Sequence, residues 1–195
     1  MRHWGKGESM RRGEAEGVFR KCRGQAKLDL DGTGTASVSS GSGFLDHMLT
    51  ALARTGSLEL SATSEPGFYR IEALGTALGR AFDVCLGDRS GIRRYGSSSV
   101  PMDDALADVA LDFSGRPYLV MAGEFRGRSI GDFDIQLLQP FLEAFCVAAR
   151  LTLHIRFYGE NDHHKAESIF KALGFALRQA AGREGTGVPS TKGVI

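Results

Sequence analysis

Two adjacent histidines followed by a glutamate form the segment of this chain whose residue types are best suited to chemistry. Asn161 or Asp162 can cap a helix that begins at His163 and His164. On that helix, Glu167 lies within about one turn of both imidazoles. Two imidazoles and a carboxylate are suitable ligands for zinc, manganese or iron. Adjacent helical side chains point about 100° apart, which favours binding to two ions over chelation of one. The alternative is a solvated polar helix end.

A second set of residues with chemical potential lies in the C-terminal tail, 183–195. Ser190, Thr191 and Lys192 stand among glycines there. Hydroxyls, an ammonium group and glycine backbone amides are the groups that bind a phosphate. We therefore expect a phosphate-binding tail, with a disordered terminus as the alternative.

Composition limits the class of protein. The 195 residues suit one large domain or two small ones, and a net charge of +1 provides no bulk field for nucleic acid or a membrane. Three widely spaced cysteines without a C-x-x-C pattern indicate a reducing compartment. We expect neither a membrane span nor a secretory signal. The chain is thus predicted to be cytoplasmic, with no nucleic-acid or membrane partner.

The elements that must position these residues are predicted from hydrophobic periodicity. Residues 1–25 are basic and lack that periodicity, so we expect a flexible arm, with an arm that binds nucleic acid or phosphate as the alternative. A first repeat, 26–88, follows. It is predicted to contain a hairpin of strands at 26–30 and 35–39, a helix at 44–53 that ends at Gly56, a strand at 58–61 and a helix at 71–82.

The same pattern restarts after a connection of loops, 89–104. The second repeat, 105–182, is predicted to have strands at 109–112 and 118–120, a helix at 133–145, a strand at 151–154 and the helix of the histidine pair. Such an internal duplication predicts an α+β fold of two mixed β-sheets, each with two helices on one face. The two halves should superpose, and each should bury its helices against the other half or another subunit.

Six motifs then identify a family. They are GFLDHML at 43–49, GIRRYG at 91–96, PMDDALA at 101–107, SGRPYLV at 114–120, the segment 163–171 and PSTKG at 189–193. From about Lys27 to Ile195 the chain resembles imidazoleglycerol-phosphate dehydratase of histidine biosynthesis. The resemblance implies a duplicated α+β fold in a 24-subunit cage, with active sites between subunits that hold two manganese ions.

The implied reaction is elimination of water from imidazoleglycerol phosphate to give imidazoleacetol phosphate. The proton to be removed is on an unactivated carbon beside the ring. An imidazolate held between two cations can push electrons out with the hydroxyl, and the metal charge offsets the cost of deprotonating the ring.

The resemblance also implies roles for individual residues. The metal ligands would be His47, Glu72, His154, His163, His164 and Glu167, of which Glu167, His47 and Glu72 would also be catalytic. Phosphate would be bound by Arg94, Arg116, Lys171, Ser190, Thr191 and Lys192. Taken singly, these histidines could instead be surface or core residues, and the cations solvated charges.

The first repeat departs from the family pattern. Phe68 and Tyr69 stand where the family has a second histidine pair, although Glu72 is retained. Further differences are Ala73, the segment 20–23, Ala51 and Thr55. Three hypotheses follow: a working dehydratase with weakened metal binding, a non-catalytic paralogue, and a subunit that co-assembles with a complete partner. Burial of Phe68 and Tyr69 in the core would close two metal positions. We predict weak, single-metal binding with slow or absent turnover.

Overall fold

The computed structural model of the chain describes residues 11–188, which form ten strands, four α-helices and one short 3-10 helix. The strands are β1 (Arg12–Phe19), β2 (Cys22–Asp29), β3 (Ala36–Ser39), β4 (Glu59–Ser64), β5 (Tyr95–Met102), β6 (Ala105–Asp112), β7 (Tyr118–Ala122), β8 (Ser129–Ile130), β9 (Phe133–Asp134) and β10 (Thr152–Tyr158). The helices are α1 (Gly43–Gly56), α2 (Arg70–Leu86), η1 (Ile135–Leu137), α3 (Leu138–Ala149) and α4 (Asp162–Ala181). None of the helices in residues 11–188 is both long and apolar enough to cross a bilayer.

Two four-stranded sheets have the same internal order, β1-β2-β4-β3 and β5-β6-β10-β7. In each sheet the first three strands are antiparallel, while β3 and β7 pair in parallel with β4 and β10. Mixed sheets in an α+β fold are confirmed. The predicted hairpin of β2 and β3 is wrong, because β4 is inserted between them and pairs with both.

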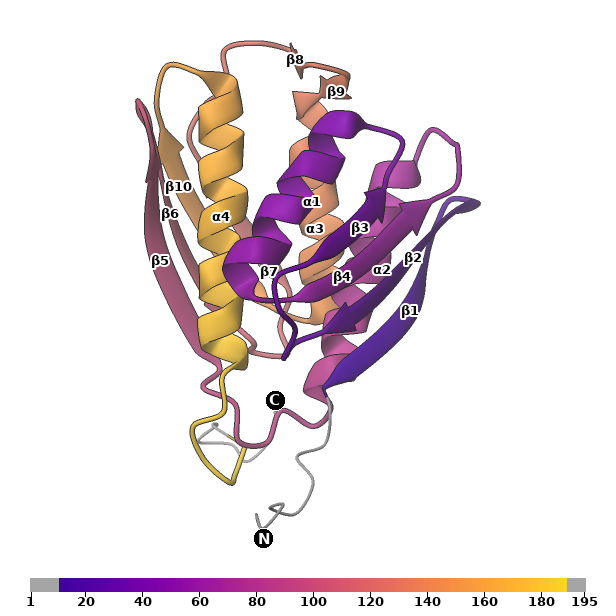
Figure 1. Cartoon of the computed structure of the whole chain (residues 1–195), viewed down its shortest axis with the longest axis vertical. Coiled ribbons are helices and arrows are strands. Elements are labelled where there is room, and N and C mark those ends of the chain that lie inside the picture. The colour runs from indigo at the N-terminus through magenta and orange to yellow at the C-terminus, as the bar shows by residue number, and fades with distance from the viewer. Residues whose placement is uncertain (1–10, 189–195) are drawn as a thin grey trace, which may run out of the picture.

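All four helices lie between the two sheets, so each sheet has helices on one face and an exposed opposite face (Figure 1). The helices α2 and α1 cover the first sheet, whereas α4 and α3 cover the second. The pairs α2–α3 and α1–α4 pack closely, and a Cβ at Gly75 or Gly79 would lie 2.5 Å from a carbonyl oxygen of α3. The two repeats therefore share one core.

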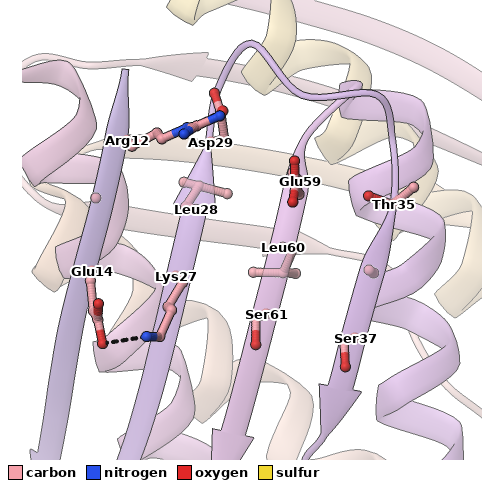
Figure 2. A pocket seen from close by; sticks show the side chains of 12 residues that line it. Arg12, Glu14, Lys27, Leu28, Asp29, Thr35, Ser37, Glu59, Leu60 and Ser61 are labelled. Atoms are coloured by element: carbon pink, nitrogen blue, oxygen red, sulfur yellow. Dashed lines mark hydrogen bonds and ion pairs between the residues drawn. The ribbon is translucent and has the colours of Figure 1, made fainter. Parts of the chain in front are cut away.

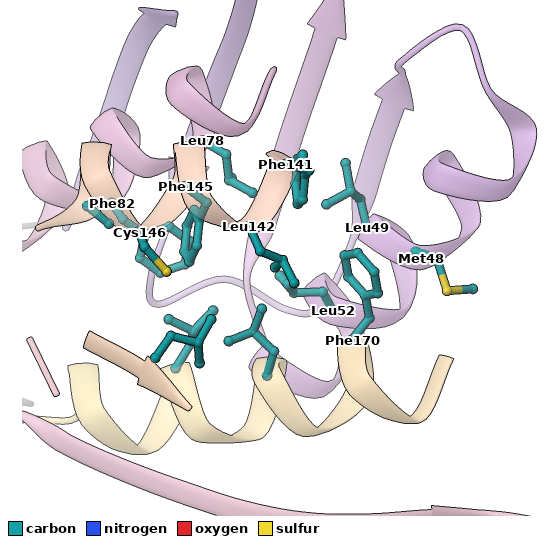
Figure 3. Close-up of a cluster of buried hydrophobic side chains, with 14 of the residues drawn as sticks. Met48, Leu49, Leu52, Leu78, Phe82, Phe141, Leu142, Phe145, Cys146 and Phe170 are labelled. Atoms are coloured by element: carbon teal, nitrogen blue, oxygen red, sulfur yellow. The ribbon is translucent and has the colours of Figure 1, made fainter. Parts of the chain in front are cut away.

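Large side chains from all four helices fill that shared core (Figure 3). Phe82 and Phe145 meet edge to face with ring centroids 5.5 Å apart, and Phe141 lies 6.2 Å from Phe170. Leu52 is 1% exposed. Burial of this apolar surface is the main stabilising contribution, at about 1.5–3 kcal/mol for each large side chain. It fixes α1 against α4, and these two helices carry His47, His163 and His164.

Two edge strands depart from the expectations drawn from sequence. The flexible arm expected through residue 25 is wrong for β1 and the start of β2, and the connection expected at 89–104 contains β5. Hydrophobic periodicity is absent because small residues face the helices. A Cβ at Gly17 would lie 2.2 Å from the Ala73 carbonyl oxygen, and one at Gly96 would lie 2.0 Å from that of Ala176. Residues 1–10 lie outside the described residues.

The outer face of the first sheet is polar and slightly hollow (Figure 2). Cross-strand ion pairs join β1 to β2: Arg12 Nε lies 2.6 Å from Asp29 Oδ2, and Lys27 Nζ lies 2.9 Å from Glu14 Oε1. The neighbouring strands contribute hydroxyls such as Ser61. Residues of β1 thus alternate between charged outward and small inward positions, a period of two that could have revealed the strand.

Candidate metal centre

Helices α1 and α4 bring three donor groups together at one end of the molecule. Asn161 caps α4 by accepting hydrogen bonds from the backbone N–H groups of His163 and His164, as predicted. One turn into the helix, Glu167 Oε2 lies 3.1 Å from His163 Nε2 and 3.3 Å from His47 Nε2 of α1. The donor atoms of these three residues all lie within 4.8 Å of one another. Three donors at this spacing suit a single cation with open coordination positions.

The carboxylate of Glu167 is buried and strongly partnered. It is 8% exposed, and its Oε1 accepts a 2.9 Å ion pair from Lys171 Nζ. Burial opposes ionisation of Glu167, but the hydrogen bond and charge of Lys171, with hydrogen bonds from His47 and His163, outweigh it and lower the pKa. An ionised carboxylate between two imidazoles is a good cation ligand.

His164 points away from this three-donor cluster. The rings of His163 and His164 are perpendicular, with centroids 6.3 Å apart, in agreement with the divergence expected on a helix. His164 Nδ1 lies 2.7 Å from Asp104 Oδ1, at the turn between β5 and β6. Its Nε2 lies 3.6 Å from Asp103 Oδ2. Within one chain, the histidine pair therefore serves two separate positions.

The segment between β7 and η1 straps α1 to α4 beside the cluster. Asp132 accepts hydrogen bonds from Ser42 Oγ at 2.8 Å and from the backbone N–H groups of Gly43 and Phe44 at 2.7 and 3.1 Å. These groups form the N-terminus of α1, where a carboxylate is favourable. The Phe44 ring in turn packs edge-on against His163, with centroids 5.5 Å apart.

The strap is held at its other end by α4. Asp162 accepts hydrogen bonds from the backbone N–H groups of Arg126 and Gly127 at 3.0 and 2.7 Å. Lys165 is 1% exposed; it pairs with Asp162 at 2.5 Å and donates to the Glu124 carbonyl at 2.8 Å. These contacts fix the position of α4 relative to α1, and hence the distance between His47 and Glu167.

At the start of α2, the corresponding end of the first repeat, the described residues place no imidazole. Phe68 is 85% exposed and so does not pack in the core. Tyr69 lies with its ring 5.7 Å from that of Phe19 and under the Arg20 guanidinium, whose Nη1 donates to the Tyr69 hydroxyl at 3.0 Å. Glu72 Oε2 is buried and has no hydrogen-bond partner among residues 11–188.

His154 lies apart from the other candidate ligands. It is on β10, paired with Ala110 and Val120, while its neighbours Leu153 and Ile155 face the helices. His154 therefore projects from the outer face of the second sheet. The structure does not bring it together with the cluster within one chain.

The two candidate phosphate arginines share one end of the second sheet, away from the histidine pair. Arg94 Nε and Nη2 pair with both carboxylate oxygens of Asp112, at 2.6 and 3.0 Å, and Arg116 is exposed in the loop after β6. Lys171 is with Glu167 instead. The tail 183–187 runs beside this end, with Gly91 N–H donating to the Gly187 carbonyl at 2.8 Å. Ser190, Thr191 and Lys192 lie outside the described residues.

Sequence patterns do not predict the role of Asp104, Asp132 or Lys165 in holding this arrangement. They predict Asp162 only as a possible helix cap, and the PMDDALA motif contributes only to the family resemblance. The aspartates lie at turns or at a helix start, where carboxylates commonly accept backbone hydrogen bonds. Lys165 carried a signal, because a lysine inside an apolar helical face must find partners when buried.

Comparisons with known proteins agree on one family. The profile of the imidazoleglycerol-phosphate dehydratase family matches residues 40–177. Imidazoleglycerol-phosphate dehydratase of Methanosarcina barkeri is 43% identical over 95% of this chain and 100% of its own length; that of Methanococcoides burtonii is 46% identical over 88% and 92%. The crystal structure of the Staphylococcus aureus dehydratase has a TM-score of 0.78 at 32% identity, covering 88% of this chain and 99% of that one. IGPD of Pyrococcus furiosus has a TM-score of 0.80 at 31% identity, covering 92% and 99%.

Proposed function

Because the chain belongs to the imidazoleglycerol-phosphate dehydratase family, we propose that it eliminates water from imidazoleglycerol phosphate in the cytoplasm, as a step of histidine biosynthesis. The product would be imidazoleacetol phosphate. The observation that carries the proposal is the cluster of His47, His163 and Glu167, whose donor atoms lie within 4.8 Å of one another. Conserved fold alone would not support an activity, since function depends on the site.

The three-donor cluster fits one divalent cation, for which we propose manganese. Imidazole and carboxylate donors suit this ion, and three protein donors leave positions open for a substrate. When bound, the cation would stabilise negative charge on the substrate imidazole. Lys171 keeps Glu167 ionised from the side opposite the imidazoles. The strap between β7 and η1 holds the N-terminus of α1 through Asp132, and α1 places His47 next to Glu167.

A second ion requires donors that one chain keeps apart. His164, His154 and Glu72 lie at three other positions, and Phe68 and Tyr69 supply no imidazole. We propose that His164 and His154 act in sites completed by other copies, in a homo-oligomer of 24 subunits. The buried Glu72 Oε2, which lacks a partner among the described residues, suits a ligand role there. The metal position at Glu72, where Phe68 and Tyr69 supply no imidazole, would bind a cation weakly.

Phosphate recognition is proposed for Arg94, Arg116, Lys171 and the tail residues Ser190, Thr191 and Lys192. The arginines lie at the sheet end where the tail leaves the fold, which supports a shared anion site for these groups. Lys171 lies on α4 beside the metal cluster. Lys171 would contact the phosphate bound by these arginines only if that lysine belonged to another copy of the chain.

The proposal is tested by metal analysis and turnover of the purified full chain with manganese. We expect about one bound ion per chain, with weak affinity, and slow, manganese-dependent dehydration. His163→Ala should lose both. A folded wild-type protein that binds manganese without turnover would favour the alternative, a co-assembling or ligand-binding cage subunit. Absence of metal binding would overturn the proposed centre.

A further inference from the structure

The turn between β5 and β6 holds the second histidine of the pair through a single carboxylate. Asp104 Oδ1 lies 2.7 Å from His164 Nδ1. Its Oδ2 accepts hydrogen bonds from the backbone N–H groups of Glu160 and Asn161, at 2.5 and 2.9 Å. Gly159 permits this close approach, since its φ is +146° and a Cβ there would lie 2.8 Å from Ala105. Both oxygens of Asp104 are thus committed.

This contact decides which ring nitrogen carries the proton. Asp104 Oδ2 already accepts two backbone N–H groups, and a carboxylate has no proton to donate, so Oδ1 acts as the acceptor toward His164. His164 Nδ1 must therefore donate. In a neutral imidazole, Nε2 is then the free lone pair, the arrangement by which carboxylates orient histidine ligands in metal sites.

The free nitrogen points outward rather than into the three-donor cluster. His164 Nε2 faces Asp103 Oδ2 at 3.6 Å, and the side chain of His164 is 25% exposed. Asp103, at 76% exposed, is not engaged as Asp104 is. A lone imidazole and an exposed carboxylate at the surface form only part of a cation site.

We propose that Asp104 is a positioning residue, which fixes His164 as the Nδ1-protonated tautomer and presents Nε2 outward as a ligand for a divalent cation. The inference rests on the proposed function, because it assigns a role within that metal chemistry. It does not depend on which copy supplies the remaining donors.

A double-mutant cycle separates this role from a purely structural one. Asp104→Asn should weaken manganese binding at the site to which His164 contributes by about 10–100-fold, the usual effect of removing a ligand-orienting partner. In a His164→Asn background the same change should cause no further loss of affinity. The lower melting temperature of Asp104→Asn should persist in both backgrounds, because the backbone hydrogen bonds to Oδ2 do not involve His164.

The matched control is Asp134→Asn, which caps η1 by accepting from Gln136 N–H at 3.0 Å and has no contact with His164. It should leave manganese affinity unchanged. Additive effects of Asp104→Asn and His164→Asn on affinity would overturn the inference.

A metal-free readout keeps the inference distinct from the proposed function. The chain has five histidines, so ¹⁵N magnetic resonance of histidine-labelled protein can be assigned by single substitutions. We expect His164 to be protonated at Nδ1 in the wild type and to become a mixture of tautomers in Asp104→Asn. An Nε2-protonated wild-type ring would reject the inference, even if manganese binds. Correct tautomer without manganese binding would instead reject the proposed function.

Discussion

The two ends at which α2 and α4 begin have the same backbone plan and opposite chemistry. Each helix starts beside a two-residue hairpin turn, Arg20–Lys21 between β1 and β2 and Asp103–Asp104 between β5 and β6. In the second repeat the acidic turn holds His164. In the first repeat the basic turn holds Tyr69, through a cation–π contact and a hydrogen bond.

The glutamates one turn further along show the consequence of this difference. Glu167 contacts His47, His163 and Lys171, whereas Glu72 Oε2 has no partner in residues 11–188. Duplication thus preserved the positions of two carboxylates, but within residues 11–188 only Glu167 has imidazole partners. The fold therefore supplies both sites, whereas the residues at each helix start decide whether a cation can bind.

The largest expected difference between the two ends is in metal affinity. Glu167→Gln should weaken manganese binding by more than about 100-fold, beyond the roughly 10–100-fold loss that outer partners cause. The change removes the charged ligand shared by two imidazoles. Glu72→Gln is the matched control and should cost less than about 10-fold. Isothermal titration with manganese measures both, and equal losses would show that the two ends bind cations alike.

The start of α2 can be converted to resemble the start of α4 by introducing a histidine pair. The double change Phe68→His plus Tyr69→His should raise manganese stoichiometry, because it places two imidazoles beside Glu72, whose Oε2 has no partner among residues 11–188. Phe68 is 85% exposed, so the substitution should not disturb the core. Adding Glu72→Gln should remove the gained ion. Unchanged metal content in the well-folded double mutant would refute this assignment of the first-repeat site.

The same comparison shows what the sequence could reveal. The helices at 44–53, 71–82 and 163 onward were predictable because their apolar faces pack on a shared core with helical spacing. Strands β1 and β5 were missed because their inward positions hold glycine and other small residues, which carry no hydrophobic period. The hydrophobic pattern of a strand does not show how closely a helix will pack against that strand.

The candidate site divides along a similar line. Residues near each other in sequence, such as His163 and Glu167, were placed correctly by helical geometry. The contact between His47 and Glu167 spans 120 residues, and was expected only through the family resemblance. Asp104 and Asp132 accept hydrogen bonds from backbone N–H groups. The positions of those groups depend on the path of the chain and not on residue type, so the sequence does not reveal these contacts.

A smaller effect should follow from removing the strap contact at α1. Asp132→Ala should lower the free energy of unfolding by about 1 kcal/mol, the usual contribution of a carboxylate at a helix N-terminus. Hydrogen bonds from Ser42, Phe44 and Gly43 lower the pKa of Asp132 from its ordinary 3.8. The contribution of Asp132 is therefore fully present above pH 3.8 and is lost as pH falls through the folded-state pKa.

Chemical denaturation of wild type and Asp132→Ala at several pH values tests this sign. The stability difference should be constant near neutral pH and shrink in acid. A difference that grows in acid would contradict the account. Asp134→Ala is a suitable control, since Asp134 caps only the short η1.

The smallest expected effect concerns Arg20, whose guanidinium contacts Tyr69 at the start of α2, where the second repeat has its histidine pair. Arg20→Ala removes a guanidinium 5.1 Å from the Tyr69 ring centroid and the 3.0 Å hydrogen bond to its hydroxyl. Exposed cation–π contacts contribute roughly 0.5–1 kcal/mol, so the unfolding free energy should fall by about that amount. Tyr69→Phe should lose less, because the ring contact remains. Lys21→Ala, at the adjacent turn position, should have little effect. If Arg20→Ala left stability unchanged but raised manganese binding at Glu72, the guanidinium would be acting mainly by repelling a cation, and the contrast between the two ends would be electrostatic and not simply a matter of missing ligands.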